Sequence, residues 1–266
     1  MLGMQFIYRE SSVSSFSNIK HDRMVKLDRI AEKLFDLLVI GISKKNRIDF
    51  TLQVHFDACK LLIRPFIFSE IIMVSGRWEP YVKNILERKV KESDVIVDVG
   101  ANIGIYAVPL AKRVKKVIAF EPHPKTSEIL EKNVKLNNIN NLILIRKAVG
   151  NSSGNVRYSL SKVPQESGIF RSNNNKIETI IEMECVDLDH ALLTESKVDW
   201  LLIDVERFEF DVLKGALNIL YKCQPRIIYE SHEEESRKVK EMLENEGYLV
   251  TQVYSIYYFA EKKREQ

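Results

Sequence analysis

The sequence predicts an α/β fold in which a mostly parallel, doubly wound sheet is covered by helices on both faces. From residue 94 onward, short apolar runs such as Val95–Val99 alternate with segments of helical periodicity. Strands that are apolar on both faces are typical of a parallel sheet between two helical layers. The regular alternation of strand and helix indicates βαβ units.

Six apolar runs are predicted as strands: Val95–Val99, Lys116–Phe120, Leu142–Ala148, Trp200–Val205, Arg226–Glu230 and Tyr248–Tyr254. The segments between them predict helices at Ile105–Arg113, Pro124–Leu136, Phe208–Tyr221 and Glu233–Glu246. The last apolar run, 255–260, follows the sixth strand so closely that the two should form a hairpin at the end of the sheet.

One segment, 151–186, interrupts this alternation. Its two β-like runs flank a polar stretch, which predicts an inserted pair of strands around a flexible loop from Lys162 to Lys176. The loop could be a substrate lid or simple surface, and its composition does not decide between the two.

The chain before the sheet predicts a different organisation. Residues 1–18 are rich in serine and indicate a flexible tail. Apolar residues recur every three or four positions from Lys20 to Ile42, which predicts an amphipathic helix. The stretch Ile48–Ile72 indicates short strands or hairpin pieces, and Pro80–Arg88 a further helix. We therefore expect a tail (1–18), a helical and β extension (19–90) and a main domain (91–266) with the insertion 151–186.

The composition excludes several classes of protein. The 40 basic and 37 acidic residues leave a formal charge of +3, which makes a nucleic-acid partner unlikely without excluding one. The three cysteines are far apart and lie in no Cys/His cluster, so we expect buried thiols, a reducing cytoplasm and no zinc site. No apolar run reaches the roughly 20 residues of a membrane span, and no secretory signal is visible at the N-terminus.

A candidate cofactor site follows the first predicted strand, in the turn Asp98-Val-Gly-Ala-Asn-Ile-Gly104. Ligands of open α/β sheets bind beyond the carboxyl ends of the strands. Gly100 and Gly104 allow a sharp turn and a close approach of the backbone to a ligand. Free amides at the start of the following helix attract a carboxylate or phosphate.

The second predicted strand ends at an acid, Glu121. A carboxylate there can accept hydrogen bonds from both hydroxyls of a ribose and disfavours a ribose with a 2′-phosphate. The glycine spacing is not the GxGxxG fingerprint of dehydrogenases, and a plain tight turn is the alternative reading. The glycine turn and the acid together favour a nucleoside cofactor.

Several strand ends together carry a resemblance to a known family. The segments are Asp98-Val-Gly-Ala-Asn-Ile-Gly104, Ala119-Phe-Glu-Pro-His-Pro124, Leu202-Ile-Asp-Val-Glu206, Glu209-x-x-Val-Leu-Lys-Gly-Ala216 and Pro225-x-Ile-Ile-x-Glu230. They resemble the methyltransferase FkbM family over roughly residues 78–260. The resemblance implies a seven-stranded, Rossmann-like methyltransferase fold with S-adenosylmethionine as cofactor. It also implies a small-molecule or glycan acceptor, methylated on a hydroxyl.

The resemblance also implies roles for individual residues. The cofactor would contact Asp98, Gly100, Ala101, Asn102, Gly104, Glu121, Pro122, Ala148, Val149 and Asp204, with the ribose at Glu121 and the adenine near Ala148 and Val149. Trp78-Glu79 resembles an aromatic–acid element that precedes the first strand in the family.

The candidate catalytic residues are Asp204, Glu206 and His232, at or just beyond strand ends on the expected ligand side. A carboxylate or imidazole there could take the proton of an acceptor hydroxyl. The family usually has glycine after the second of these acids, whereas this chain has Arg207. Arginine could pair with an anionic substrate or tie up Glu206 in an ion pair. Carboxylates near Asp204 could hold a divalent metal, but with no third clear ligand we predict none.

Other functions remain open at this stage. Related sheets methylate RNA or protein, although the near-neutral charge argues mildly against RNA. An NAD-dependent oxidoreductase would use a similar nucleoside site, and a non-catalytic module could keep the cofactor pocket without turnover. The sequence says nothing about the oligomeric state.

Overall fold

The computed structural model describes residues 51–263 apart from 66, 76–77, 162–166 and 171–178. Residues 50–266 form one compact unit, and residues 1–49 are assigned to another. The predicted tail (1–18), the predicted helix Lys20–Ile42 and most of the predicted loop Lys162–Lys176 lie outside the described residues. The proposed boundary near residue 90 therefore stays a prediction.

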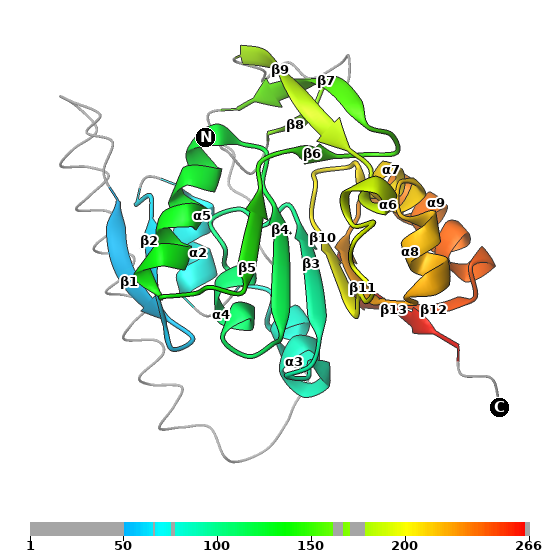
Figure 1. Ribbon diagram of the computed structural model, residues 1–266, viewed down its shortest axis with the longest axis horizontal. Helices are drawn as coiled ribbons and strands as arrows, with labels where there is room; N and C mark the ends of the chain where they lie inside the picture. The colour runs from blue at the N-terminus through cyan, green and yellow to red at the C-terminus, as the bar shows by residue number, and fades with distance from the viewer. Residues whose placement is uncertain (1–50, 66, 76–77, 162–166, 171–178, 264–266) are drawn as a thin grey trace, which may run out of the picture. The chain divides into compact units, whose positions relative to one another are not determined.

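The main sheet has seven strands in the order β12-β13-β11-β10-β3-β4-β5 (Figure 1). Their bounds are β3 Val95–Val99, β4 Lys116–Phe120, β5 Leu142–Ile145, β10 Trp200–Ile203, β11 Arg226–Glu230, β12 Tyr248–Tyr254 and β13 Tyr257–Lys262. The strands β5, β4, β3, β10 and β11 pair in parallel, and β13 is antiparallel to both of its neighbours. The predicted doubly wound, mostly parallel sheet and its C-terminal hairpin are confirmed.

Alternating side chains of the central strands feed two separate apolar cores. Ile96 packs into one core, and Val97 and Val99 pack into the other, as the pleat of a strand requires. The first core is covered by α2 Phe68–Val74, α3 Pro80–Lys89, α4 Ala107–Ala111 and α5 Pro124–Leu136. The second is covered by α6 Leu188–Ala191, α7 Glu209–Lys214, α8 Leu217–Lys222 and α9 Glu233–Asn245. Helices thus cover both faces of the sheet, as the apolar strands predict.

A hairpin precedes the sheet and docks on α5. The hairpin consists of β1 Leu52–Phe56 and β2 Cys59–Ile63. The Leu62 amide donates to Asn133 Oδ1 of α5 at 2.6 Å, and Asn133 Nδ2 donates back to Leu62 O at 3.2 Å. These bonds satisfy backbone groups on the open edge of β2. The prediction of strand as far as Ile72 is wrong, because α2 follows and buries Glu70 and Met73 on one helical face.

The insertion forms a small second sheet of four strands in the order β6-β9-β7-β8. They are β6 Ala148–Val149, β7 Gly154–Leu160, β8 Gly168–Ile169 and β9 Thr179–Val186. The predicted continuous strand Leu142–Ala148 is wrong, since β5 ends at Ile145 and Ala148 belongs to this second sheet. Arg146 and Lys147 separate the two strands, and each pairs with an acid, Glu131 and Glu184 respectively. Two solvated ion pairs in succession are incompatible with a strand buried on both faces.

The predicted helix Phe208–Tyr221 is also wrong as one element, because it is divided into α7 and α8 at Gly215 and Ala216. The backbone at Gly215 passes so close to Gly150 that a Cβ there would lie 2.1 Å from Gly150 O. Asp189 then provides a separate cap for α8 by accepting hydrogen bonds from the amides of Asn218 and Ile219, at 2.9 and 3.0 Å.

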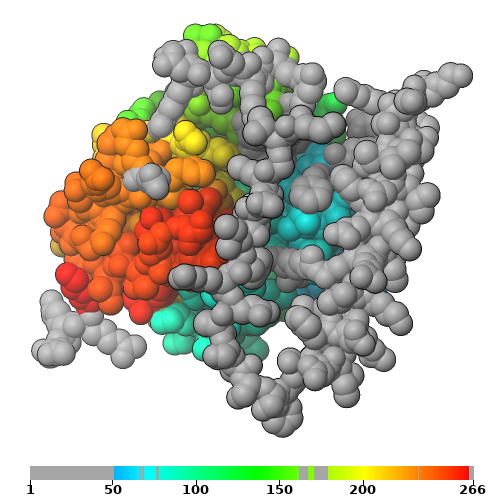
Figure 2. All heavy atoms as spheres, turned by 180° about the vertical axis from the view of Figure 1, so that it is seen from behind, coloured from blue at the N-terminus to red at the C-terminus, as the bar shows by residue number. Residues whose placement is uncertain are grey.

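Figure 2 shows the C-terminal hairpin in red beside the orange surface of α9.

The composition predicts buried thiols and no membrane-spanning segment. Cys59 and Cys185 are buried, Cys223 is half-buried, and all three are free thiols. Within the described ranges, no helix has the length and apolar character needed to cross a bilayer.

Candidate active site

The candidate cofactor turn lies where the strand order reverses, between β3 and β10, which is the usual ligand position in an open α/β sheet. Gly100 has φ +89°, and a Cβ there would lie 1.8 Å from Asp204 O, so this position requires glycine. The amides of Gly100 and Ala101 donate to Phe120 O at 2.9 and 3.0 Å. The turn is thereby fixed to the ends of both neighbouring strands.

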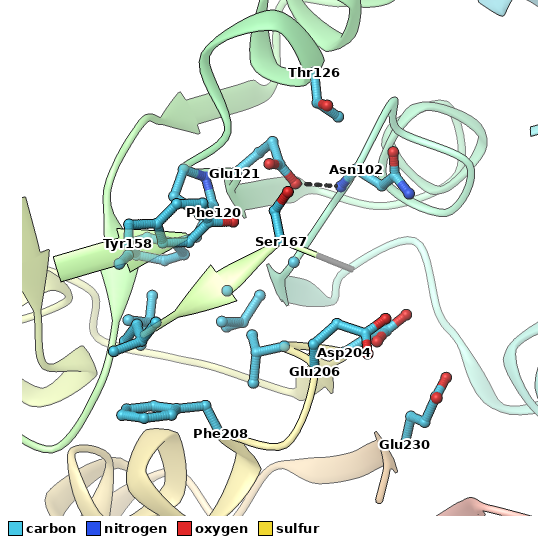
Figure 3. Close-up of a pocket in the computed structure, with 18 of the residues that line it drawn as sticks. Asn102, Phe120, Glu121, Thr126, Tyr158, Ser167, Asp204, Glu206, Phe208 and Glu230 are labelled. Carbon is cyan, nitrogen blue, oxygen red and sulfur yellow. Dashed lines mark hydrogen bonds between the residues drawn. The ribbon is translucent and has the colours of Figure 1, made fainter. Parts of the chain in front are cut away.

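Glu121, at the end of β4, holds the same turn from the other side. Its Oε2 accepts a hydrogen bond from the Asn102 amide at 2.8 Å (Figure 3). Its Oε1 accepts one from the His123 amide at 2.8 Å. Each carboxylate oxygen retains a lone pair for a ligand. Burial raises the pKa of Glu121 to about 7, although the two amides act in the opposite direction.

A cavity of about 290 Å³ opens beside this turn and has two chemically different sides. In Figure 3, Phe120, Tyr158 and Phe208 lie on one side, and Asp204, Glu206 and Glu230 lie on the other. The apolar side is completed by Pro122, Ala148, Val149 and Ile169. Tyr158 and Ile169 come from β7 and β8, so the insertion lines the cavity. The sequence alone could not decide whether the loop of this insertion covers a substrate or is simple surface.

Three carboxylates from different elements lie together where the acidic side of this cavity meets a smaller adjoining cavity. Glu79 precedes α3, Asp204 follows β10 and Glu230 ends β11, and one oxygen from each lies within 4.8 Å of the others. The hydroxyls of Tyr106 and Tyr257 donate to the two oxygens of Glu79 at 2.5 and 3.0 Å. Sequence reasoning missed Tyr257, which carries no motif, and reached Glu79 only through the Trp78-Glu79 resemblance.

These carboxyl groups bind protons more tightly than isolated ones. Burial and then the neighbouring charges of Glu230 and Glu206 raise the pKa of Asp204 well above its ordinary value, even though the side chain opens onto the cavity. Burial likewise raises the pKa of Glu79 to about 7. Groups that open onto a cavity and have displaced pKa values are typical of functional sites.

The two outer residues of the predicted turn have different surroundings. Asp98 lines a small adjoining cavity together with Glu79, Asp204 and Glu230, and its Oδ2 has no hydrogen-bond partner among the described residues. Burial and the charges of Glu121 and Glu79 raise the pKa of Asp98 to about 7. Gly104 lines neither cavity; a Cβ there would lie 2.5 Å from Leu130 Cδ1, which indicates a packing role.

His232 lies apart from the other candidate catalytic residues. It precedes α9, and its Nε2 is 3.8 Å from Glu230 Oε1. Its side chain lines a neighbouring open cavity, together with Arg207 and Lys238, and not the one beside Gly100. The structure therefore brings Asp204 and Glu206 to the cofactor turn and leaves His232 at the rim.

Residues 98–250 match the family model described as the methyltransferase FkbM domain. The chain belongs to the methyltransferase FkbM family. The resemblance drawn from the strand-end motifs is thereby confirmed, and membership favours methyl transfer over the hydride transfer of an oxidoreductase.

Individual relatives differ in the acceptor that their names state. The chain is 30% identical over 181 residues to a hexuronic acid methyltransferase of Haloferax volcanii, covering 66% of this chain and 72% of the relative. It is 34% identical over 94 residues to a tRNA (guanine(37)-N(1))-methyltransferase of Pyrococcus abyssi, covering 35% and 25%. A crystal structure of an FkbM methyltransferase from Methylobacillus flagellatus shares the fold, with a TM-score of 0.50 and 14% identity over 65% of this chain and 44% of that one.

The family's usual glycine after Glu206 is explained by the backbone of this FkbM protein. Glu206 and Arg207 both have positive φ values, +54° and +73°. Glu209 Oε1 accepts a hydrogen bond from the Arg207 amide at 3.1 Å and holds the turn in this conformation. Among the ion pairs of the described residues, none joins Arg207 to Glu206, so the expected pairing of these two side chains is not found.

We expect Arg207→Gly to stabilise the FkbM domain by about 0.5–1 kcal/mol. A left-handed conformation costs an L-residue about 1–2 kcal/mol, and glycine avoids this cost while losing about 0.5–1 kcal/mol of backbone entropy. Urea unfolding measures the difference. Arg237→Gly, on the exposed face of α9, is the matched control and should destabilise by about 1 kcal/mol. A destabilised Arg207→Gly variant would contradict the backbone explanation.

The raised pKa values predict an unusual pH dependence of stability for the ligand-free FkbM protein. Asp98, Glu79 and Glu121 titrate near pH 7 in the folded state, whereas unfolded carboxyls release their protons near pH 4. Between these values the folded chain binds more protons, so the free energy of unfolding falls as pH rises. We expect a loss of more than about 1 kcal/mol from pH 5 to pH 7.5 in urea unfolding. Asp98→Asn should flatten the profile, and a stability that rises over this range would contradict the assignment.

Proposed function

We propose that this protein transfers the methyl group of S-adenosylmethionine to a hydroxyl group of a sugar or another small molecule. The observation that carries this proposal is a single cavity with two kinds of lining. The glycine turn and Glu121 offer groups for a nucleoside, and Asp204 and Glu206 lie in the same cavity as candidates for the acceptor side.

The donor would extend along the cavity from its apolar to its acidic side. The ribose hydroxyls would donate to the free lone pairs of Glu121, and the adenine would lie near Pro122, Ala148 and Val149. The methionine part would follow Gly100, Ala101 and Asn102 towards Asp98 and Asp204. Tyr158 and Phe208, which sequence reasoning did not single out, would cover the adenine from the opposite side.

The transfer itself is an in-line displacement. Bound S-adenosylmethionine would supply a methyl group on a cationic sulfur; the acceptor oxygen would bond to the methyl carbon as the carbon–sulfur bond broke and left its electron pair on sulfur. The acceptor proton passes to a carboxylate, for which Asp204 and then Glu206 are the candidates; His232 would act only on an acceptor that extends to the rim. Alignment of the two reactants contributes about 7–11 kcal/mol and a general base about 10²–10⁴-fold.

An acidic sugar is the acceptor class that we favour. The relative named as a hexuronic acid methyltransferase is similar over most of its length. Arg207 is exposed at the rim, and its guanidinium makes no ion pair with any described residue, so it is available for the carboxylate of such a sugar. RNA is the alternative acceptor, supported by the shorter match to the tRNA enzyme. Three free thiols agree with a cytoplasmic location, which we propose with the function.

Methyl incorporation from labelled S-adenosylmethionine tests the proposal. The label is followed into a low-molecular-weight extract, a glycan fraction, total RNA and total protein. We expect incorporation into the first or second, and label in RNA or protein alone would overturn the small-molecule acceptor. Calorimetry with S-adenosylhomocysteine and with NAD tests the cofactor separately: binding of NAD alone would reverse the assignment. Binding of S-adenosylhomocysteine without transfer to any fraction would favour a non-catalytic module.

A further inference from the structure

The carboxylates of Glu79, Asp204 and Glu230 form a cluster that lacks a counter-charge in the described part of the chain. No described lysine or arginine forms an ion pair with any of the three, and His232 Nε2, which is charged only when protonated, lies 3.8 Å from Glu230 Oε1. Like charges this close repel one another, although Asp204 is exposed and Glu79 and Glu230 are half-buried. Such a cluster requires protons or a bound cation.

Asp98 provides a second, independent observation. It is 95% buried, since its relative exposure is 5%. Its Oδ2 finds no hydrogen-bond donor among the described residues. It lines the same small cavity as the three carboxylates. A buried oxygen without a donor is costly unless a ligand satisfies it, so this cavity suits a cationic or hydrated group.

We propose that Glu79, Asp204 and Glu230 bind a divalent, oxygen-preferring cation, with Mg²⁺ or Mn²⁺ as the class. The donor set consists of carboxylate oxygens only, which suits Mg²⁺, Mn²⁺ and Ca²⁺ and not zinc. Metal–oxygen distances of about 2.1–2.6 Å allow one ion to bridge oxygens up to about 4.2–5.2 Å apart. The three oxygens lie within 4.8 Å of one another, which is inside the span of a larger ion such as Ca²⁺. For Mg²⁺ or Mn²⁺ the side chains would have to close by a few tenths of an ångström.

Two tyrosines fix the orientation of one of the ligands. Tyr106 and Tyr257 donate to opposite oxygens of Glu79 at 2.5 and 3.0 Å. Partners that orient a ligating carboxylate are a regular feature of metal sites. Tyr257 belongs to β13 and Tyr106 precedes α4, so Glu79 is held by two segments that are far apart in the chain. This sets the cation beside the acidic side of the main cavity, where it could hold an oxygen of the acceptor.

The site was outside the reach of the sequence analysis, which expected no metal because it found no third ligand near Asp204. The third ligand is Glu79, which lies 125 positions before Asp204 in the chain. Glu79 itself has a left-handed backbone conformation, with φ +44°, directly before Pro80 at the start of α3. This conformation determines where its side chain lies.

Manganese binding to the full chain tests the inference without any methyl transfer. Protein freed of metals with EDTA is titrated with MnCl₂, and bound Mn²⁺ is followed by electron paramagnetic resonance and calorimetry. We expect one site, weakened at least tenfold by Glu79→Gln and about tenfold by Tyr257→Phe, which keeps the shape of the side chain and removes one hydrogen bond. Glu206→Gln removes a charge from the same cavity outside the cluster and should weaken Mn²⁺ binding by less than about threefold.

Repeating the titration with saturating S-adenosylhomocysteine separates the cation from the methyl donor. We expect Mn²⁺ to remain bound. Displacement of Mn²⁺ would show that the amino group of the donor occupies the cluster, and would overturn the inference while supporting the proposed cofactor. Absence of a Mn²⁺ site in folded wild-type protein, or equal losses in Glu206→Gln and Glu79→Gln, would also overturn it. Mn²⁺ binding without S-adenosylhomocysteine binding would instead support the cation site and contradict the proposed function.

Discussion

Asp204→Asn is expected to lower kcat for methyl transfer at least about 100-fold. It should weaken the binding of S-adenosylhomocysteine by no more than about tenfold, because asparagine keeps an acceptor oxygen towards the methionine part. Asparagine has the same shape, so the hydrogen bond from the residue 204 amide to Val99 O at 2.9 Å should persist. What is lost is the negative charge and the ability to take a proton from the acceptor. Removing a charge from a crowded acidic cluster should also stabilise the fold, because the neighbouring acids repel Asp204.

The measurement combines steady-state turnover, calorimetry and thermal unfolding on the same preparation. Glu206→Gln is the comparison, since it removes a carboxylate from the same cavity but not from the cluster with Glu79 and Glu230. A larger loss for Asp204→Asn than for Glu206→Gln would support Asp204 as the principal group. Turnover at the wild-type rate in Asp204→Asn would remove this residue from the site.

The parts of the fold that local sequence determines were predictable. Uninterrupted apolar runs such as Val95–Val99 are required for strands between two helical layers, and the positions of Gly100 and Glu121 follow from where those strands end. Gly100 and Glu121, the two strand-end residues on which the predicted site was based, therefore line the same cavity. The roles of its residues remain predictions.

The parts that depend on distant contacts were not predictable. Gly215 ends α7 because Gly150, from another segment, approaches its Cα. Tyr158 reaches the cavity because the strands of the insertion pair with one another in a second sheet. The register of that pairing cannot be predicted from local sequence. Glu79 joins Asp204 only through the packing of α3 beside the sheet. In each case the deciding contact joins residues far apart in the chain, which periodicity does not record.

Glu121→Ala is expected to weaken binding of S-adenosylhomocysteine by about 100-fold or more. Two hydrogen bonds from ribose hydroxyls to a charged acceptor contribute about 1.5–3 kcal/mol each, and 1.4 kcal/mol corresponds to tenfold. The substitution also releases the amides of Asn102 and His123, which loosens the turn. Glu121→Gln keeps one acceptor oxygen and should lose about tenfold. Glu131→Ala removes the same charge from α5, where the side chain is half-buried, pairs with Lys135 and lies outside the cavity, and this variant should bind normally.

The pH dependence distinguishes a ribose acceptor from a residue that only holds the turn. Because burial raises the pKa of Glu121 to about 7, much of the free protein carries a protonated carboxyl at neutral pH. Only the ionised form accepts from both hydroxyls, so binding should release a proton and strengthen from pH 6 to pH 8. Calorimetry in buffers of different ionisation enthalpy counts that proton, and Glu121→Gln should abolish its release. A ligand that binds equally well at both pH values, with no proton released and no loss in Glu121→Ala, would place the ribose elsewhere and leave Glu121 as a support of the Asn102 turn.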